Sequence, residues 1–348
     1  MSSLPQPNPP APELAVRRHP LLTVENLFVQ YRVPRGLVGT IARRPQQFVH
    51  AVDGVSFSVG RGEMLALVGE SGCGKTTTAQ AVLRLVETKS GSIRLHDTEL
   101  TELSHRVLRP LRRRMQMIYQ DPYESLDPRL RVRQAVEEPL LIHGLSGPKA
   151  ARRGRVADAL ARVELTPPEL FIDRYPHELS GGQRQRVAIA SSLVLEPELL
   201  VADEPVSMLD VSVRAGVLSL LDGLRRSGLG ILMITHDLST ASHFADRIAV
   251  MYLGRIVEEG PARAVIRDPQ HPYTKALISA VPPRDPRRGR TPTILKGEAP
   301  NAVVIPSGCR FHPRCPVAEP RCSSIDPELH VPRGAAGGGE HRAACVLV

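Results

Sequence analysis

A glycine-rich segment followed by lysine and threonine is the first part of the chain whose residue types suggest chemistry. Residues 69–76 match the spacing G-x-x-x-x-G-K-[ST] in full, after an apolar run at 64–68 and before a helical pattern at 76–85. Glycines let successive backbone N–H groups point at phosphate oxygens, and a helix start adds its positive dipole end. We therefore predict a loop that binds nucleotide phosphates.

Two side chains of this loop have specific expected roles. Lys75 would place its charge on the outer phosphates, and Thr76 would offer its hydroxyl to Mg²⁺. Because Cys73 is a thiol inside the loop, we expect its alkylation to block nucleotide hydrolysis and bound nucleotide to protect it. The predicted nucleotide-binding residues of the loop and its helix start are Gly69, Glu70, Ser71, Gly72, Cys73, Gly74, Lys75, Thr76 and Thr77.

Two adjacent carboxylates follow the apolar run at 199–202, which reads as a buried strand. Asp203 would hold a water bound to Mg²⁺, and Glu204 would polarise the attacking water as a general base. Two acids at a strand end also occur simply as solvated ends, but the complete phosphate loop favours the chemical interpretation. The pair therefore predicts hydrolysis in addition to binding.

A second helix start narrows the class of protein. Residues 179–186 read Leu-Ser-Gly-Gly-Gln-Arg-Gln-Arg, about twenty residues before the two carboxylates. Ser180 is a good N-cap, and two glycines then open a helix predicted at 181–195. The segment is therefore a second anion-binding helix start, separate from the first.

With these three motifs in this order, residues 20–265 resemble the nucleotide-binding subunits of ABC transporters. The resemblance implies that two subunits sandwich two ATP molecules head to tail. It also implies that one subunit contacts the nucleotide on the other through Ser180, Gly181, Gly182 and Gln183. The implied cofactors are ATP and Mg²⁺.

The resemblance assigns further roles around the nucleotide. Gln120 would contact Mg²⁺, as Thr76 and Asp203 would, and it would couple to the membrane subunits. His236 would contact the γ-phosphate. The stretch 207–210 resembles the family's Ser-Ala-Leu-Asp loop, with Met208 as a departure. Tyr31 is the candidate for stacking on adenine, and packing against the sheet is the alternative for this residue.

Strands alternating with helices predict an α/β fold. Apolar or alternating runs at 22–31, 49–57, 64–68, 115–119, 199–202 and 231–235 read as strands. Helical patterns lie at 76–85, 211–224 and 238–245, and others at 131–143, 150–163 and 181–195 form an all-helical insertion. The resemblance implies an ABC cassette of the P-loop NTPase class, with a RecA-like parallel sheet, an antiparallel β subdomain and a helical subdomain at about 121–196.

Composition shifts suggest the domain limits. We expect a disordered, Pro-rich lead-in at 1–20 and the ATPase domain at 21–265, with a basic insert of unassigned role at 34–47. We expect a C-terminal region at 266–348, in which a linker at 282–290 leads into a small Cys-rich module. Stretches at 51–57, 120–123, 268–274 and 308–316 resemble the ATPases of oligopeptide/dipeptide importers. Relatives in that group carry oligopeptides, dipeptides, nickel complexes, glutathione or oligosaccharides, so the solute stays open.

Four of the five cysteines crowd the last forty residues: Cys309, Cys315, Cys322 and Cys345. Their spacing fits zinc poorly, because zinc pairs favour two to four intervening residues. Four thiolates could instead hold a 4Fe–4S cluster, which the resemblance implies for some relatives. Four reduced cysteines in a loosely packed tail are the alternative, and both interpretations stay open on the sequence.

Composition restricts the partners and the location. Aromatic residues make up only 3% of the 348 residues, Trp is absent and the Arg residues behind the net charge of +9 are scattered, which argues against a nucleic-acid surface. No apolar run approaches the roughly 18–20 residues that cross a bilayer. We expect a peripheral protein on the cytoplasmic face of the cell membrane. The resemblance implies as partners a second, paralogous ATPase, two transmembrane permease subunits and an extracytoplasmic solute-binding protein, whereas a soluble ABC ATPase acting on nucleic acid is the alternative function.

Overall fold

The computed structural model describes residues 20–35, 45–121, 125–145, 147–281, 295, 297–298, 300–332 and 338–348. The expected lead-in at 1–19, most of the insert at 34–47, the linker at 282–290 and residues 122–123 lie outside the described residues. Among the described residues, no helix is both long enough and apolar enough to cross a membrane.

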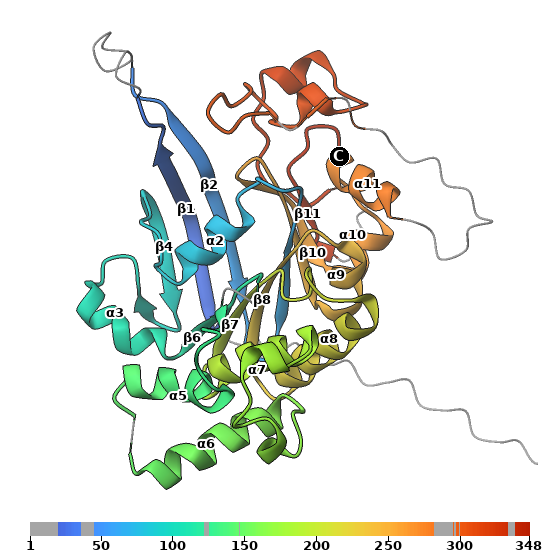
Figure 1. Cartoon of the computed structure of the whole chain (residues 1–348). Coiled ribbons are helices and arrows are strands. Elements are labelled where there is room, and N and C mark those ends of the chain that lie inside the picture. The colour runs from blue at the N-terminus through green and yellow to red at the C-terminus, as the bar shows by residue number, and fades with distance from the viewer. Residues whose placement is uncertain are drawn as a thin grey trace, which may run out of the picture.

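A seven-stranded sheet forms the centre of the molecule, with strand order β11-β10-β9-β3-β8-β7-β6 (Figure 1). The strands from β9 to β6 pair in parallel, whereas β10 and β11 add antiparallel pairs at one edge. The strands of this sheet are β3 (Met64–Val68), β6 (Met115–Ile118), β7 (Leu199–Asp203), β8 (Gly230–Thr235), β9 (Arg247–Tyr252), β10 (Arg255–Pro261) and β11 (Arg342–Ala343).

A second sheet is antiparallel and stands beside the first, with strand order β2-β1-β4-β5. Its strands are β1 (Leu22–Arg32), β2 (Phe48–Val59), β4 (Ser90–Leu95) and β5 (Thr98–Glu99). Polar residues alternate with buried ones along β1 and β2, as expected for strands with only one face in the core. This sheet and the parallel sheet match the two sheets expected from the sequence.

Burial on both faces explains the apolar runs of the central strands. Every residue of β3, β7 and β8 is buried. Alternate residues of β3 enter different cores: Met64, Ala66 and Val68 pack in one, and Leu65 and Leu67 in the other. The carboxyl ends of the parallel strands therefore share one edge, where polar side chains can converge.

Helices cover the sheet and form a separate layer. Between β6 and β7 the described residues form helices and 3₁₀ turns without a strand, as the sequence predicts. In Figure 1, α5, α6 and α7 lie together beyond the edge of β6. The helices and turns are α2 (Lys75–Val82), α3 (His105–Arg112), α5 (Val132–Ile142), α6 (Lys149–Arg162), η1 (Pro168–Leu170), η2 (Pro176–Glu178), α7 (Gly181–Leu193), α8 (Val211–Arg226), α9 (Leu238–Phe244), α10 (Ala262–Arg267), α11 (Pro272–Ala280), η3 (His312–Arg314), η4 (Pro320–Ser323) and η5 (Gly338–Glu340).

The C-terminal region, residues 266–348, is joined to the central sheet and its core, so the expectation of a small Cys-rich module is not supported. β11 pairs with β10, with Glu258 opposite Ala343. The rings of Tyr273 and Phe311 pack on Tyr252 at centroid distances of 4.7 and 5.2 Å, in the same core as β3. This shared core is the reason that the region does not form a separate module.

A buried carboxylate attaches this region to the sheet. Glu258 of β10 is fully buried, and it accepts hydrogen bonds from the backbone N–H groups of Gln270 and His271 at 2.8 and 2.9 Å. The ring Nε2 of His341, also fully buried, lies 2.8 Å from the same carboxylate. Glu258 therefore links β10, the start of α11 and the chain just before β11.

Replacing this carboxylate should destabilise the protein. Glu258→Ala removes the acceptor of one buried and one partly buried N–H group and a contact of the buried His341, so we expect a loss of about 3 kcal/mol in the free energy of unfolding. Urea denaturation measures it. Glu328→Ala, which removes an exposed carboxylate of the same region, is the control and should leave the midpoint unchanged. An unchanged midpoint for Glu258→Ala would contradict this role.

Candidate functional site

The phosphate loop lies between β3 and α2, and its glycines are required by close backbone contacts. A Cβ on Gly69 would stand 2.2 Å from the carbonyl oxygen of Met251, and one on Gly74 would stand 2.1 Å from that of Ala51. Gly74 also has φ of 105°, a conformation that side chains disfavour. Only glycine at both positions lets the loop fit against these neighbouring strands.

The lysine of the motif folds back into the loop. The ammonium group of Lys75 donates to the carbonyl oxygens of Gly69 and Glu70 at 2.8 and 2.9 Å, and it is buried. The loop therefore surrounds a fixed positive charge, next to the start of α2. Both features favour an anion in this place.

Oxygen donors suited to Mg²⁺ meet behind the loop. The hydroxyl of Thr76 donates to Oδ1 of Asp203 at 3.2 Å, and Asp203 is 5% exposed. Burial raises the pKa of Asp203, an effect that the hydrogen bond from Thr76 opposes. A hydroxyl and a carboxylate held together fit Mg²⁺, which takes few protein ligands and keeps several waters.

Glu204 is the centre of a second set of contacts, at the ends of three strands. Its carboxylate accepts from Nε2 of Gln120 at 3.3 Å and lies 3.0 Å from Nδ1 of His236. Its backbone has φ of 46°, which is uncommon outside glycine, and its N–H donates to the carbonyl of Ile234 at 3.0 Å. Such conformations cost free energy and concentrate at functional sites.

A cavity of about 700 Å³ unites most of these groups. Tyr31 enters its lining from β1, and three residues that the sequence did not indicate also line it: Val49, Ala51 and Ala302. The carbonyl of Ala302 accepts from the N–H of His50 at 3.0 Å, so the C-terminal region forms part of the wall. The predicted residues that line the cavity are Tyr31, Ser71, Gly72, Gly74, Lys75, Thr76, Thr77, Gln120, Glu204 and His236.

Other predicted residues lie outside this lining. Gly69, Glu70 and Asp203 instead contact residues of the lining: the carbonyl groups of Gly69 and Glu70 accept from Lys75, and the carboxylate of Asp203 accepts from Thr76. The thiol of Cys73 is 5% exposed and packs in the core with Leu65 and Leu67. Burial raises the pKa of this thiol and so slows its alkylation, the reaction that the sequence predicts to block hydrolysis.

The second helix start is well formed but stands apart from the cavity. Ser180 caps α7: its hydroxyl accepts from the N–H of Gln183 at 3.3 Å, and its own N–H donates to the Gln183 side chain at 3.0 Å. A Cβ on Gly182 would stand 2.3 Å from the side chain of Val213, so glycine is required for packing on α8. The four residues Ser180, Gly181, Gly182 and Gln183 do not line the cavity.

Comparison with known proteins identifies the family. Residues 52–207 match the family model "ABC transporter", and residues 257–322 match "Oligopeptide/dipeptide transporter, C-terminal region". A "probable peptide ABC transporter ATP-binding protein" of Sinorhizobium fredii is 46% identical over 319 residues, which cover 91% of this chain and 88% of that protein. This chain belongs to the ABC transporter ATPases.

Two further comparisons bear on this ABC ATPase. A glutathione import ATP-binding protein of Salmonella paratyphi A is 49% identical over 284 residues, 81% of this chain and 44% of that protein. A solved ATP-binding cassette, a dimer in a post-hydrolysis state with ADP and phosphate, is 27% identical, with a TM-score of 0.60 over 70% of this chain and 99% of that one. The structural match supports the cassette fold expected from the sequence.

The C-terminal cysteines of the ABC ATPase meet, but not as a metal site. Cys309, Cys315, Cys322 and Cys345 line one cavity of only about 10 Å³, room for about one water molecule. Among the described residues, no three His, Cys, Asp or Glu form a group that could hold a metal ion. Burial also raises the pKa of three of these thiols. The expectation of a 4Fe–4S cluster is therefore not supported, because the space among the four cysteines is too small and no metal-binding group is found among the described residues.

The burial of Cys73 predicts a specific pH dependence. Because only the thiolate reacts and the pKa is raised, the alkylation rate should still climb about tenfold per pH unit beyond pH 9, where an ordinary thiol levels off. Mass spectrometry of the Cys73 peptide after brief treatment with iodoacetamide measures this rate. The urea-unfolded chain is the control and should level off near its ordinary pKa. A plateau below pH 9 in the folded protein would contradict the raised pKa.

Proposed function

We propose that this chain is the ATP-hydrolysing subunit of an ABC importer that energises peptide uptake. The observation that carries the ATPase assignment is the convergence of Lys75, Thr76 and Glu204 on one cavity at the carboxyl ends of the parallel strands. The match of residues 257–322 to the oligopeptide/dipeptide C-terminal region supports the cargo class. We divide the chain at about residue 265, into the ATPase domain at 21–265 and the C-terminal region.

In our proposal the phosphates of ATP lie along residues 69–77. Lys75 exchanges its loop carbonyl acceptors for phosphate oxygens, a neighbouring position that its flexible side chain can reach. Thr76, Asp203 and Gln120 hold Mg²⁺, directly or through water, and this ion supplies charge neutralisation for the β- and γ-phosphates. Tyr31 stacks on adenine, which its place in the cavity lining supports.

Hydrolysis follows from the position of Glu204. Its carboxylate accepts a proton from water as the water oxygen attacks the γ-phosphorus, and the bond to the leaving ADP oxygen breaks to give ADP and phosphate. Gln120 and His236 restrict the carboxylate from two sides, at 3.3 and 3.0 Å. His236, 61% exposed, can also donate to the γ-phosphate.

A second ATPase subunit completes the site in this proposal. The start of α7 carries the positive end of the helix dipole, and Ser180, Gly181, Gly182 and Gln183 would contact the γ-phosphate held by a partner. Their separation from the cavity within one chain supports a site shared between two chains. We propose a paralogue as that partner, because the importer group usually pairs two different ATPases.

The remaining partners follow from the importer assignment. We propose two transmembrane permease subunits, an extracytoplasmic solute-binding protein and a peripheral location on the cytoplasmic face of the membrane. The likeness to a glutathione import protein favours small peptides as cargo and keeps glutathione itself as an alternative. Oligosaccharides and nickel complexes have weaker support, as does a soluble ATPase acting on nucleic acid.

Removing the proposed base should separate hydrolysis from binding. In Glu204→Gln we expect ATP hydrolysis to fall at least about 100-fold, while nucleotide affinity changes little, because the amide cannot accept the proton. Phosphate release and binding of a fluorescent ATP analogue measure the two effects. Glu196→Gln is the matched control, since Glu196 is exposed and also has positive φ, of 54°. Hydrolysis by Glu204→Gln at the rate of the unmodified protein would refute the assignment.

Uptake by cells tests the transport role. A strain whose only copy of this ATPase carries Glu204→Gln should lose uptake of labelled di- to pentapeptides, because the transporter cannot complete its cycle. The strain with Glu196→Gln should retain uptake. Labelled glutathione, maltooligosaccharide and nickel, measured in the same two strains, identify the cargo. If none of these solutes depends on Glu204, the importer proposal is wrong.

A further inference from the structure

The second residue of the phosphate loop, Glu70, is held by the C-terminal region. Its backbone N–H donates to the hydroxyl of Tyr273 in α11 at 2.9 Å. Its carboxylate accepts two hydrogen bonds from the guanidinium of Arg314 in η3, at 2.8 and 3.2 Å. Both the backbone and the side chain of Glu70 are therefore fixed by residues more than 200 positions away.

Arg314 is itself fixed in place. Its side chain is 9% exposed, and its guanidinium stands 5.9 Å from the ring centre of Tyr252, which packs on Tyr273 and Phe311. Burial acts to lower the pKa of Arg314, but the hydrogen bonds and charges of Glu70 and Tyr252 together outweigh it, and the pKa lies above its ordinary value. The Glu70 side chain is 30% exposed, so the pair is partly buried. A partly buried, two-point arginine–carboxylate pair is stronger and better oriented than an exposed one.

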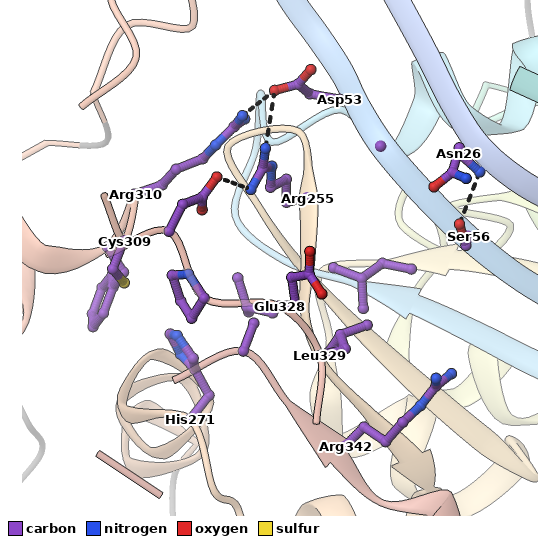
Figure 2. Close-up of a pocket in the computed structure, with 17 residues that line it drawn as sticks. Asn26, Asp53, Ser56, Arg255, His271, Cys309, Arg310, Glu328, Leu329 and Arg342 are labelled. Atoms are coloured by element: carbon purple, nitrogen blue, oxygen red, sulfur yellow. Dashed lines mark hydrogen bonds and ion pairs between the residues drawn. The ribbon is translucent and has the colours of Figure 1, made fainter. Parts of the chain in front are cut away.

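A separate set of contacts docks this segment independently of Arg314. The guanidinium of Arg310, 7% exposed, donates to Asp53 in β2 and, at 2.6 Å, to the carbonyl of Leu253. Figure 2 shows Arg255 also directed at Asp53, at 3.8 Å, and Arg255 pairs in addition with Asp326 at 2.6 Å. The segment is therefore attached to β2 and to the β9–β10 turn through Arg310. Its docking does not depend on Arg314 alone.

The charge of the Glu70 carboxylate suggests what Arg314 does. The Glu70 carboxylate belongs to the loop that receives the phosphates, and ATP is strongly anionic. An uncompensated carboxylate there would repel the nucleotide, and partial burial would weaken the screening of this repulsion. The Arg314 cation compensates that charge while its two hydrogen bonds hold the loop.

We propose that Arg314 is a positioning residue of the nucleotide site: it neutralises Glu70 and fixes the phosphate loop, so that the C-terminal region sets the affinity for ATP. This inference rests on the proposed nucleotide site at residues 69–77. It predicts that the charge on Glu70, and not only the contact, determines how tightly ATP binds.

The test is a rescue experiment on the full chain, with a fluorescent ATP analogue and Mg²⁺. Arg314→Ala should weaken binding about tenfold at low salt, and this loss should shrink at 0.5 M salt. Adding Glu70→Gln to Arg314→Ala should restore most of the affinity, because the repelling charge is gone. A merely structural role for Arg314 predicts no rescue, since the double variant still lacks the contact.

Two further variants keep the test decisive. Glu70→Gln alone leaves the Arg314 cation unopposed and should bind ATP at least as tightly as the unmodified protein, which is measurable even if Arg314→Ala does not fold. Arg321→Ala removes an exposed arginine of the same region, which pairs with the exposed Glu319 at 2.8 Å, and should change nothing. Weaker binding by Glu70→Gln, unchanged binding by Arg314→Ala, or a double variant as weak as Arg314→Ala would each overturn the inference.

Lys75→Ala separates this inference from the proposed site. If Lys75→Ala binds the nucleotide as tightly as the unmodified protein, the nucleotide site itself is wrongly placed. If Lys75→Ala abolishes binding while the Arg314 variants behave as the unmodified protein does, the site stands and the role of Arg314 fails.

Discussion

The whole site depends on how closely the phosphate loop approaches the backbone of its neighbours. Gly69 lies against the carbonyl of Met251 in β9, and Gly74 against that of Ala51 in β2. The loop thus touches the parallel sheet and the antiparallel sheet at once, at the junction where they meet. Neither position has room for a Cβ. The shape of the loop and the relative placement of the two sheets therefore depend on each other.

The parallel order of the strands explains why the proposed catalytic groups come from several strands. β3 presents the loop, β7 ends in Asp203 and Glu204, and β8 is followed by His236. Since these strands run in parallel, their carboxyl ends meet at one edge, beside the loop. Glu204 has positive φ, and its carboxylate contacts Gln120 and His236. In a regular strand, by contrast, the side chain would point to one face of the sheet.

The sequence was sufficient to predict an element where its pattern of residue types has one physical explanation. Runs such as 64–68 and 231–235 predicted buried strands because only strands covered on both faces are apolar throughout. The sequence did not predict strands whose pairing is long-range and whose own residues show little pattern. Strand β4 contains Ser90 and Gly91 and has little pattern, and β11 has two residues and no period.

Long-range contacts that no motif marks could not be read from the sequence. Arg314 is one of 45 lysines and arginines, and nothing local marks Glu70 as its partner among 36 acidic residues. Ala302 lines the cavity through its backbone position, which a small apolar side chain does not signal. The cysteines show the opposite case: their proximity was foreseeable from their crowding, whereas the lack of space between them depends on packing.

The edges of the central sheet have a consequence for assembly. One edge is β11, two residues long, where Arg342 pairs with Glu259, and the other is β6, four residues long. Short edge strands resist the addition of a foreign strand, as do charged side chains such as the Arg342–Glu259 pair at β11, and both protect natural proteins from edge-to-edge aggregation. A second copy of this chain therefore has little to gain by extending this sheet at either edge.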